Sequence, residues 1–183
     1  METDEDHIID AEKAGKLEDE SRYRFLSREK LLKNIDKGDT VIEIGSGTGF
    51  YTDDLAEKAE KVYAIDFQEE MHEFYRNKGI PENVELVHSK ASDIDIEEAD
   101  TIVSIFSFHE IDAEKALKQF SEVLEKSGKL LIIDWSREGS EENGPPLDKR
   151  FNAEEASKLV SGFFEVEKAF EREDTFLVEA FKN

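Results

Sequence analysis

The residues with the clearest chemical potential form a turn with three alternating glycines, Gly45, Gly47 and Gly49. Glycine adopts backbone angles that other residues avoid, and its missing side chain lets a ligand approach the main chain. The apolar run before this turn predicts a buried strand, and the pattern after it predicts a helix. In a doubly wound sheet, such a turn lies at the carboxyl edge where cofactors bind. The turn is therefore a candidate cofactor site.

The residues around the turn separate three kinds of ligand. A phosphate-binding P-loop needs a Lys followed by Ser or Thr at the end of a longer spacing, and this turn contains no Lys. A dinucleotide fingerprint places its third glycine at position 50, where this chain has Phe50. The remaining interpretation is a cofactor that places no phosphate at the turn.

The spacing Glu43-x-Gly45-x-Gly47-x-Gly49 resembles motif I of the class I S-adenosylmethionine-dependent methyltransferases. The resemblance implies that the backbone of the turn, including Ser46, packs against the methionine portion of S-adenosylmethionine. It also implies that Glu43 orients the loop or the amino group of the cofactor. The resemblance extends across most of the chain.

The ends of the next strands complete the cofactor site that the resemblance implies. Asp66 ends the second predicted strand and corresponds to the family's ribose-binding carboxylate, which can accept hydrogen bonds from both ribose hydroxyls. Phe67 would then lie beside the adenine. Ile105 and Phe106, at the end of the fourth predicted strand, resemble the segment that flanks the sulfonium.

The family's adenine-edge segment corresponds to residues 89–93 of this chain. Lys90 stands where the family usually has Asp, so we expect the adenine contact from Ser92 or Asp93, with the backbone of Ala91 as a further partner. The chain resembles, more narrowly, the small bacterial and archaeal methyltransferases grouped with the ubiquinone and menaquinone methylases, the methyltransferase type 11 group. The matching residues are 108–111, 126–130, 133–135 and 144–150. That group acts on many substrates, so the resemblance implies the chemistry and leaves the acceptor open.

His109 follows the fourth predicted strand, at the edge where the methyl acceptor should lie. With an ordinary pKa near 6.5, it could take a proton from the acceptor, or it could cap or pack beneath the next helix instead. Transfer from a sulfonium needs no base when the acceptor is already nucleophilic. The other candidates for the substrate pocket, each with packing or surface pairing as the alternative role, are Tyr23, Phe106, Trp135 and Arg150.

The elements that must position these residues alternate between strands and helices. Hydrophobic periodicity predicts strands at residues 40–44, 62–65, 84–87, 101–106 and 130–135. It predicts helices at residues 19–35, 50–59, 68–77 and 112–125. After a polar loop at 136–149, a capping box at Asn152 and Glu155 begins a last helix, which ends near Gly162. Strands at 164–170 and 175–181 are close enough to form an antiparallel hairpin.

This alternation predicts an α/β fold: a three-layer, doubly wound, Rossmann-like methyltransferase sheet, mostly parallel, with a C-terminal antiparallel β-hairpin. We expect a single methyltransferase domain over residues 1–183. It comprises an N-terminal tail and helical lid at 1–36, a cofactor-binding core at 40–135, and a substrate-side loop, helix and hairpin at 136–183. Tyr23 and Arg24 lie on the predicted lid helix and could close over the carboxylate of the cofactor.

The composition narrows the class of partner. The chain has 46 acidic and 24 basic side chains and a formal charge of −22, which disfavours nucleic acids and anionic membranes. It contains no Cys, which excludes disulfides and thiolate zinc sites, and His7, His72 and His88 are scattered singly, so no metal site is predicted. The first ten residues lack a signal-peptide pattern, so we expect a soluble, cytoplasmic protein. The acid excess points to a high-salt, halophilic cytoplasm.

The function predicted from these observations is transfer of a methyl group from S-adenosylmethionine to a small-molecule acceptor, with S-adenosylhomocysteine as the product. The main alternative is a non-catalytic S-adenosylmethionine-binding sensor or assembly module. A nicotinamide-dependent oxidoreductase is a second alternative, which Phe50 disfavours. Methylation of nucleic acid is a third, which the net charge disfavours.

Overall fold

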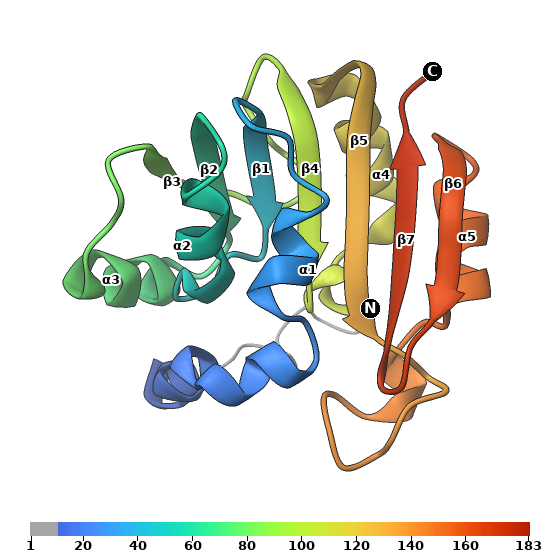
Figure 1. Ribbon diagram of the computed structural model, residues 1–183, viewed down its shortest axis with the longest axis horizontal. Helices are drawn as coiled ribbons and strands as arrows, with labels where there is room; N and C mark the ends of the chain where they lie inside the picture. Colours follow the sequence, from blue (N-terminus) through green and yellow to red (C-terminus); the bar gives the residue numbers. More distant parts are fainter. Residues whose placement is uncertain (1–10) are drawn as a thin grey trace.

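The structure is a computed structural model, and it describes residues 11–183. In this part of the chain, one seven-stranded sheet has the order β3-β2-β1-β4-β5-β7-β6 (Figure 1). The strands are β1 Thr40–Ile44, β2 Lys61–Asp66, β3 Val84–His88, β4 Ala99–Ile105, β5 Leu124–Trp135, β6 Glu165–Glu171 and β7 Thr175–Phe181. Residues 1–10, which include His7 and the first part of the predicted N-terminal tail and lid, lie outside the described residues.

The sheet is parallel except at its C-terminal end. β1 pairs in parallel with β2 and β4, β3 pairs in parallel with β2, and β5 pairs in parallel with β4. β7 lies antiparallel between β5 and β6. The predicted fold class is confirmed, including the hairpin, because a link of three residues between β6 and β7 is too short for a parallel crossover.

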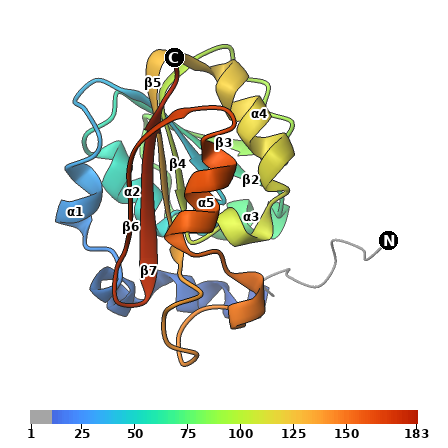
Figure 2. The ribbon, with the colours of Figure 1, turned by 90° about the vertical axis from the view of Figure 1, so that its right-hand side faces the viewer.

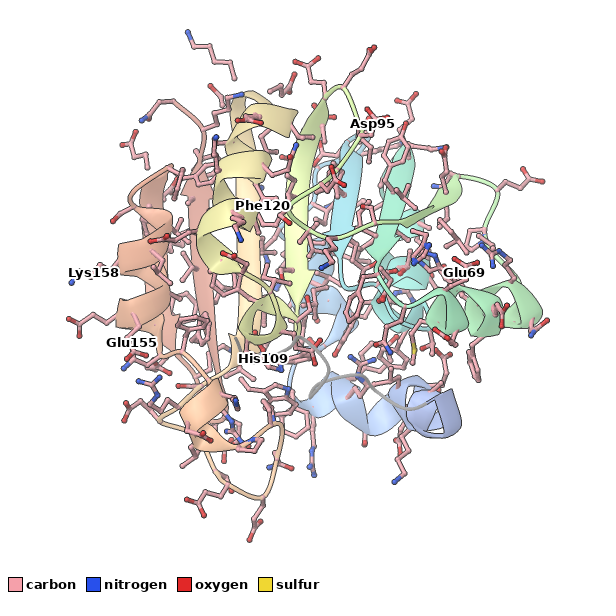
Figure 3. The ribbon with its side chains drawn as sticks, turned by 180° about the vertical axis from the view of Figure 1, so that it is seen from behind. Glu69, Asp95, His109, Phe120, Glu155 and Lys158 are labelled. Atoms are coloured by element: carbon pink, nitrogen blue, oxygen red, sulfur yellow. The ribbon has the colours of Figure 1, made fainter. Side chains whose placement is uncertain are left out.

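Helices cover both faces of the sheet (Figure 2). α1 (Arg28–Leu32) and α2 (Phe50–Ala56) pack on one face, and α4 (Ala113–Val123) and α5 (Ala153–Val160) pack on the other, seen in front in Figure 3. α3 (Glu69–Lys78) lies against β2 and β3.

Two hydrophobic cores, one on each face, hold these layers together. Along β5, Leu130 and Ile132 belong to the core under α4 and α5, while Leu131 and Ile133 belong to the core under α1 and α2. Side chains alternate across a strand, so a strand buried on both faces is apolar at every position, and this explains the continuous apolar run.

The predicted helix at 19–35 is wrong. The chain forms two 3₁₀ segments, η1 (Ala11–Glu18) and η2 (Glu20–Arg24), followed by the short α1. The side chain of Asp19 accepts a hydrogen bond from the backbone N–H of Ser21 at 2.8 Å, and Ser27 Oγ accepts one from the N–H of Lys30 at 3.3 Å. Each capping residue starts a new helical segment, so the apolar stripe is divided between them.

Other boundaries differ by a few residues. α4 ends at Val123, and β5 begins at Leu124 instead of after Gly128. Leu124 pairs with Ala99 of β4, and this pairing draws the end of the predicted helix into the sheet. The predicted capping box is confirmed, because the side chain of Asn152 and that of Glu155 each accept a hydrogen bond from the other's backbone N–H. Within residues 11–183, no helix has both the length and the apolar character needed to cross a membrane.

Candidate functional site

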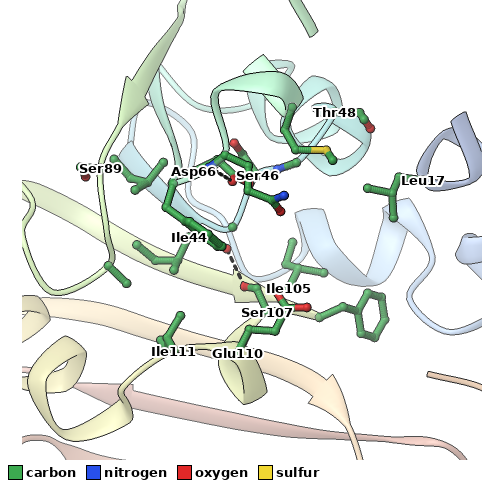
Figure 4. A pocket seen from close by; sticks show the side chains of 18 of the residues that line it. Leu17, Ile44, Ser46, Thr48, Asp66, Ser89, Ile105, Ser107, Glu110 and Ile111 are labelled. Atoms are coloured by element: carbon green, nitrogen blue, oxygen red, sulfur yellow. Dashed lines mark hydrogen bonds between the residues drawn. The ribbon is translucent and has the colours of Figure 1, made fainter. Parts of the chain in front are cut away.

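A pocket lies at the carboxyl edge of the parallel strands (Figure 4). The turn after β1, the end of β2, the segment after β3 and the segment after β4 all contribute to its lining, and Leu17 and Arg22 enter it from the N-terminal segment. The crevice between β1 and β4 is where the strand order reverses, which is the usual position of a ligand in an open α/β sheet.

The glycine turn has the backbone geometry that its sequence predicts. Gly45 and Gly49 have φ angles of 68° and 85°, a region that side chains disfavour. A Cβ atom at Gly45 would lie 2.5 Å from the Cβ of Ser107, and one at Gly49 would lie 2.2 Å from the ring of Tyr75. The hydroxyl of Ser107 donates to the carbonyl of Ile44 at 2.7 Å (Figure 4). Close packing on neighbouring segments thus holds the turn in place.

Asp66 connects the turns after β1 and β2. One carboxylate oxygen accepts a hydrogen bond from the N–H of Gly47 at 2.8 Å, and the other accepts one from the N–H of Gln68 at 2.9 Å. The side chain is 7% exposed, and burial raises its pKa although the backbone N–H groups lower it. A carboxylate offers about four acceptor positions, so it retains capacity for the two hydroxyls of a ribose.

Ser46 is a second polar group at the turn. It lines the pocket, and its buried hydroxyl has no hydrogen-bond partner among residues 11–183. Buried hydroxyls in folded proteins are usually paired. An unpaired one in a pocket wall fits a site that a polar ligand completes.

Glu43 lies beneath the turn and is not among the residues that line the pocket. It is 2% exposed, and its carboxylate accepts a hydrogen bond from the hydroxyl of Thr52 on α2 at 2.5 Å. Burial raises the pKa of Glu43 to about 8. Of the two roles expected for this residue, its position fits orientation of the loop, because it ties the start of α2 to β1.

Opposite the turn, the predicted adenine side is partly assembled. Phe67 and Ala91 line the pocket, and Phe67 is 44% exposed. Ser92 and Asp93 are not among the lining residues, whereas Ser89 is. The backbone N–H of Ser89 donates to the carbonyl of Asp66 at 3.1 Å, which brings the segment after β3 against the end of β2.

The N-terminal segment covers the pocket through contacts that the sequence analysis did not find. Arg22 donates to the carbonyl of Leu17 at 2.8 Å, and its guanidinium lies 4.9 Å from the ring centroids of Phe50 and Tyr51 and 5.9 Å from that of Phe106. Burial lowers the pKa of Arg22. An Arg within a polar, acidic segment has no local pattern that marks it as a pocket residue, because the aromatic rings around it are distant in sequence.

Glu18 fastens this cover to the core. Its carboxylate accepts a hydrogen bond from the hydroxyl of Thr48 in the glycine turn, and it lies 3.1 Å from the ammonium of Lys78 on α3.

Tyr23 and Arg24, the residues expected to reach the ligands, do not line the pocket. The hydroxyl of Tyr23 donates to Asp54 on α2 at 2.8 Å, and the Tyr23 ring packs 4.8 Å from that of Phe50. Arg24 donates to the side chain of Asn143 at 2.9 Å.

His109 is held in an ion-paired group behind the pocket. Its side chain is 6% exposed, and its Nδ1 lies 2.9 Å from a carboxylate oxygen of Asp134, which is fully buried. Its Nε2 lies 3.5 Å from the carboxylate of Glu110. Burial lowers the pKa of His109, but the hydrogen bonds to Asp134 and Glu110 outweigh burial and raise it to about 9. The raised pKa favours the protonated form of His109 at neutral pH and disfavours the expected role of proton acceptor, which stays a prediction.

Phe106 and Trp135 form a stacked aromatic pair beside the pocket. Phe106 lines the pocket with Ile105, and Trp135 stacks behind Phe106 with centroids 4.9 Å apart. Phe106 has a φ of 55°, a strained value of the kind found at functional sites. The ring of Phe25 also contacts Trp135, in an edge-on arrangement with centroids 4.6 Å apart. Trp135 thus packs against the pocket wall without lining the pocket.

Arg150, which the sequence analysis places among the candidates for the substrate pocket, does not line this pocket. It is 1% exposed, and its guanidinium donates to backbone carbonyls of the loop at 136–149. The acceptors are Pro145 at 2.7 Å, Ser140 at 3.0 Å, Ser136 at 3.1 Å and Asn143. Arg150 therefore shapes the loop from inside.

Several known proteins are similar to this chain in sequence and structure. Residues 42–132 match the family described as Methyltransferase domain, Methyltransf_11. The crystal structure of an S-adenosylmethionine-dependent methyltransferase from Aquifex aeolicus is 32% identical and superposes with a TM-score of 0.87, covering 96% of this chain and 100% of that chain. An uncharacterized methyltransferase of Staphylococcus carnosus is 32% identical over 148 residues, which are 78% of this chain and 70% of that protein.

Other curated relatives match over shorter parts. The probable ribosomal RNA small subunit methyltransferase A of Pyrococcus furiosus is 35% identical over 100 residues, which are 46% of this chain and 37% of that protein. An uncharacterized methyltransferase of a Geobacillus species is matched over 58% of its length. The chain thus spans less than two thirds of the length of these relatives.

The fold, the glycine turn with its carboxylate partner, and the full-length match to the Aquifex aeolicus enzyme lead to one family. The chain belongs to the class I S-adenosylmethionine-dependent methyltransferases of the type 11 group.

Proposed function

We propose that this enzyme transfers the methyl group to a small molecule that binds at the carboxyl ends of β4 and β5. The observation that carries the proposal is the pocket at the glycine turn, in which Asp66 and the unpaired hydroxyl of Ser46 offer polar contacts beside an apolar wall of Ile105 and Phe106. Bound S-adenosylmethionine supplies an electrophilic methyl group on a sulfonium. The chain contributes binding, orientation and exclusion of water.

The lining residues support a specific division of roles. The backbone of the turn from Gly45 through Gly47 to Gly49, together with Ser46, would hold the methionine portion. Asp66 would accept hydrogen bonds from the ribose hydroxyls.

On the adenine side, Phe67 and Ala91 would enclose the base. Ile105 would lie beside the sulfonium.

Arg22 completes this division at the methionine end. It is the cation that lines the pocket within residues 11–183, and it would pair with the carboxylate of the cofactor. Arg22 would thus take the role expected of Tyr23 and Arg24, whose side chains form hydrogen bonds to Asp54 and Asn143 instead.

The N-terminal segment and the loop at 136–149 would form the two sides of the acceptor entrance. Arg24 joins them through its 2.9 Å hydrogen bond to Asn143, and Phe25 packs on Trp135. Residues 11–36 would act as the lid and residues 136–183 as the acceptor side of a single domain. No base is required for an acceptor that is already nucleophilic, which agrees with the raised pKa of His109.

The net charge favours a small molecule over RNA, although a relative is described as a probable ribosomal RNA methyltransferase.

To test the proposal, the purified protein and methyl-labelled S-adenosylmethionine are incubated separately with the low-molecular-mass fraction and with the RNA fraction of a cell extract. Label in the small-molecule fraction supports the proposal. Label confined to RNA contradicts it.

A further inference from the structure

The segment after β4 places a carboxylate, Glu110, in the pocket. Glu110 ends the 3₁₀ turn η3 (Phe108–Glu110), lines the pocket, and is 25% exposed. Figure 4 shows it on the β4 side of the pocket, across from Ser46 and Asp66. The segment after β4 also carries Phe106, another residue of the pocket lining, and the proposed function places the acceptor at this strand end.

The charge of Glu110 is held in place from behind. The Nε2 of His109 lies 3.5 Å from the Glu110 carboxylate, and the other ring nitrogen of His109 is 2.9 Å from Asp134. The backbone N–H of His109 also donates to Asp134, at 2.8 Å. The pair anchors the turn to β5, so Glu110 has a defined position from which to meet a ligand.

The other charged groups of the pocket have partners of their own. Asp66 is oriented by two backbone N–H groups, and Arg22 is oriented by the carbonyl of Leu17 and by aromatic rings. With the cofactor on Asp66 and Arg22, Glu110 is the charged side chain of the described lining that is left to face the acceptor.

On the basis of the proposed function, we propose that Glu110 selects acceptors that are methylated on a neutral nitrogen, as in an amine or a nitrogen heterocycle. An amine that enters as an ammonium ion first loses its proton to water, because only the neutral nitrogen has a lone pair. That lone pair forms the N–C bond as the C–S bond breaks, and the electron pair of the C–S bond remains on sulfur as a neutral thioether. The positive charge thereby moves to nitrogen. If the new ammonium carries a proton, it loses it to water after release.

A carboxylate at this position acts differently on the possible acceptor classes. It stabilises the positive charge as that charge develops on nitrogen in the transition state, in a site where water is partly excluded. It repels a carboxylate, phosphate or phenolate acceptor before the reaction begins. The formal charge of −22 on the whole chain adds to this repulsion.

The first experiment needs no knowledge of the acceptor. Sinefungin is an analogue of S-adenosylmethionine with an ammonium group in place of the methylsulfonium, and calorimetry compares its affinity with that of S-adenosylhomocysteine. We expect Glu110→Gln to weaken the binding of sinefungin about tenfold relative to that of S-adenosylhomocysteine. The substitution keeps the shape of the side chain but removes the negative charge that would face the ammonium group of sinefungin. The affinity for S-adenosylhomocysteine should stay within about twofold of the wild type. The matched control is Glu114→Gln, which removes the same charge from an exposed position on α4 and should leave the ratio unchanged.

An unchanged ratio in Glu110→Gln, or an equal loss of S-adenosylhomocysteine binding, overturns the assignment of Glu110 to the acceptor side. Failure of the wild type to bind S-adenosylhomocysteine would instead contradict the proposed function.

The second experiment measures methyl transfer to matched pairs of an amine and a carboxylate, tryptamine with indole-3-acetate and benzylamine with benzoate. Methylation of tryptamine or benzylamine by the wild type, with a lower kcat in Glu110→Gln, supports the proposal. Methylation of indole-3-acetate or benzoate overturns the proposal, and so does a failure to methylate either amine.

Discussion

Acid sensitivity should depend strongly on one buried histidine, His72 on α3. Its side chain is fully buried, and neither ring nitrogen has a hydrogen-bond partner among residues 11–183. Burial is the largest of the causes that together lower the pKa of His72 from 6.5 to about 4. The charges of Arg76 and His88 also lower it, whereas Glu69 and the backbone of Ala64 raise it. The folded protein therefore holds a neutral imidazole where the unfolded chain binds a proton.

This difference makes the folded protein less stable as the pH falls. The folded-state pKa lies below the unfolded value, so protonation favours the unfolded chain as the pH falls below 6.5, and the effect levels off below the folded pKa of about 4. Each pKa unit corresponds to about 1.4 kcal/mol, so the full loss of stability approaches roughly 3.5 kcal/mol, and the loss at pH 5 is about 2 kcal/mol.

The assay is urea unfolding of the wild type and His72→Leu at pH 7.5 and pH 5.0. Because other groups titrate equally in both proteins, the wild type should lose about 2 kcal/mol more than the variant between the two pH values. Met71→Leu, an apolar change at the neighbouring buried position, controls for repacking and should keep the full acid sensitivity. An equal loss of stability in wild type and His72→Leu would refute the reasoning.

Three further predictions concern the cofactor site, the loop and the surface. Asp66→Asn should weaken S-adenosylhomocysteine binding about tenfold or more in calorimetry, because the ribose loses a charged acceptor; unchanged binding would remove Asp66 from the site. Arg150→Met should lower the free energy of unfolding by about 2–4 kcal/mol, since buried carbonyls lose their donors, while S-adenosylhomocysteine affinity measured alongside stays the same; a large affinity loss would instead make it a binding residue. Potassium chloride should raise the Tm by screening a net charge of −22, and a Tm that is constant or falls with salt would contradict this.

The elements with strong local signals were predictable from the sequence. β1 has the predicted bounds, and the capping box at Asn152 and the closely spaced C-terminal strands were also identified. These features depend on neighbouring residues, which is the information that periodicity and turn chemistry contain. The helix expected at 19–35 failed because Asp19 and Ser27 both cap, and a hydrophobic stripe does not reveal how many helical segments share it.

The candidate site was predictable where the backbone forms it and not where distant side chains meet. The glycine turn and Asp66 are positioned by strand ends, whose location follows from the order of elements. Arg22 was missed, and Arg150 was expected at the acceptor, because only the folded chain brings together the groups that surround each guanidinium. The rings around Arg22 come from α2 and the end of β4, and the carbonyls around Arg150 depend on the path of an irregular loop. In so acidic a chain, an Arg is generally expected to pair with surface carboxylates, and this expectation fails at both positions. Arg22 instead contacts the segment that covers the pocket, and Arg150 holds the loop beside it.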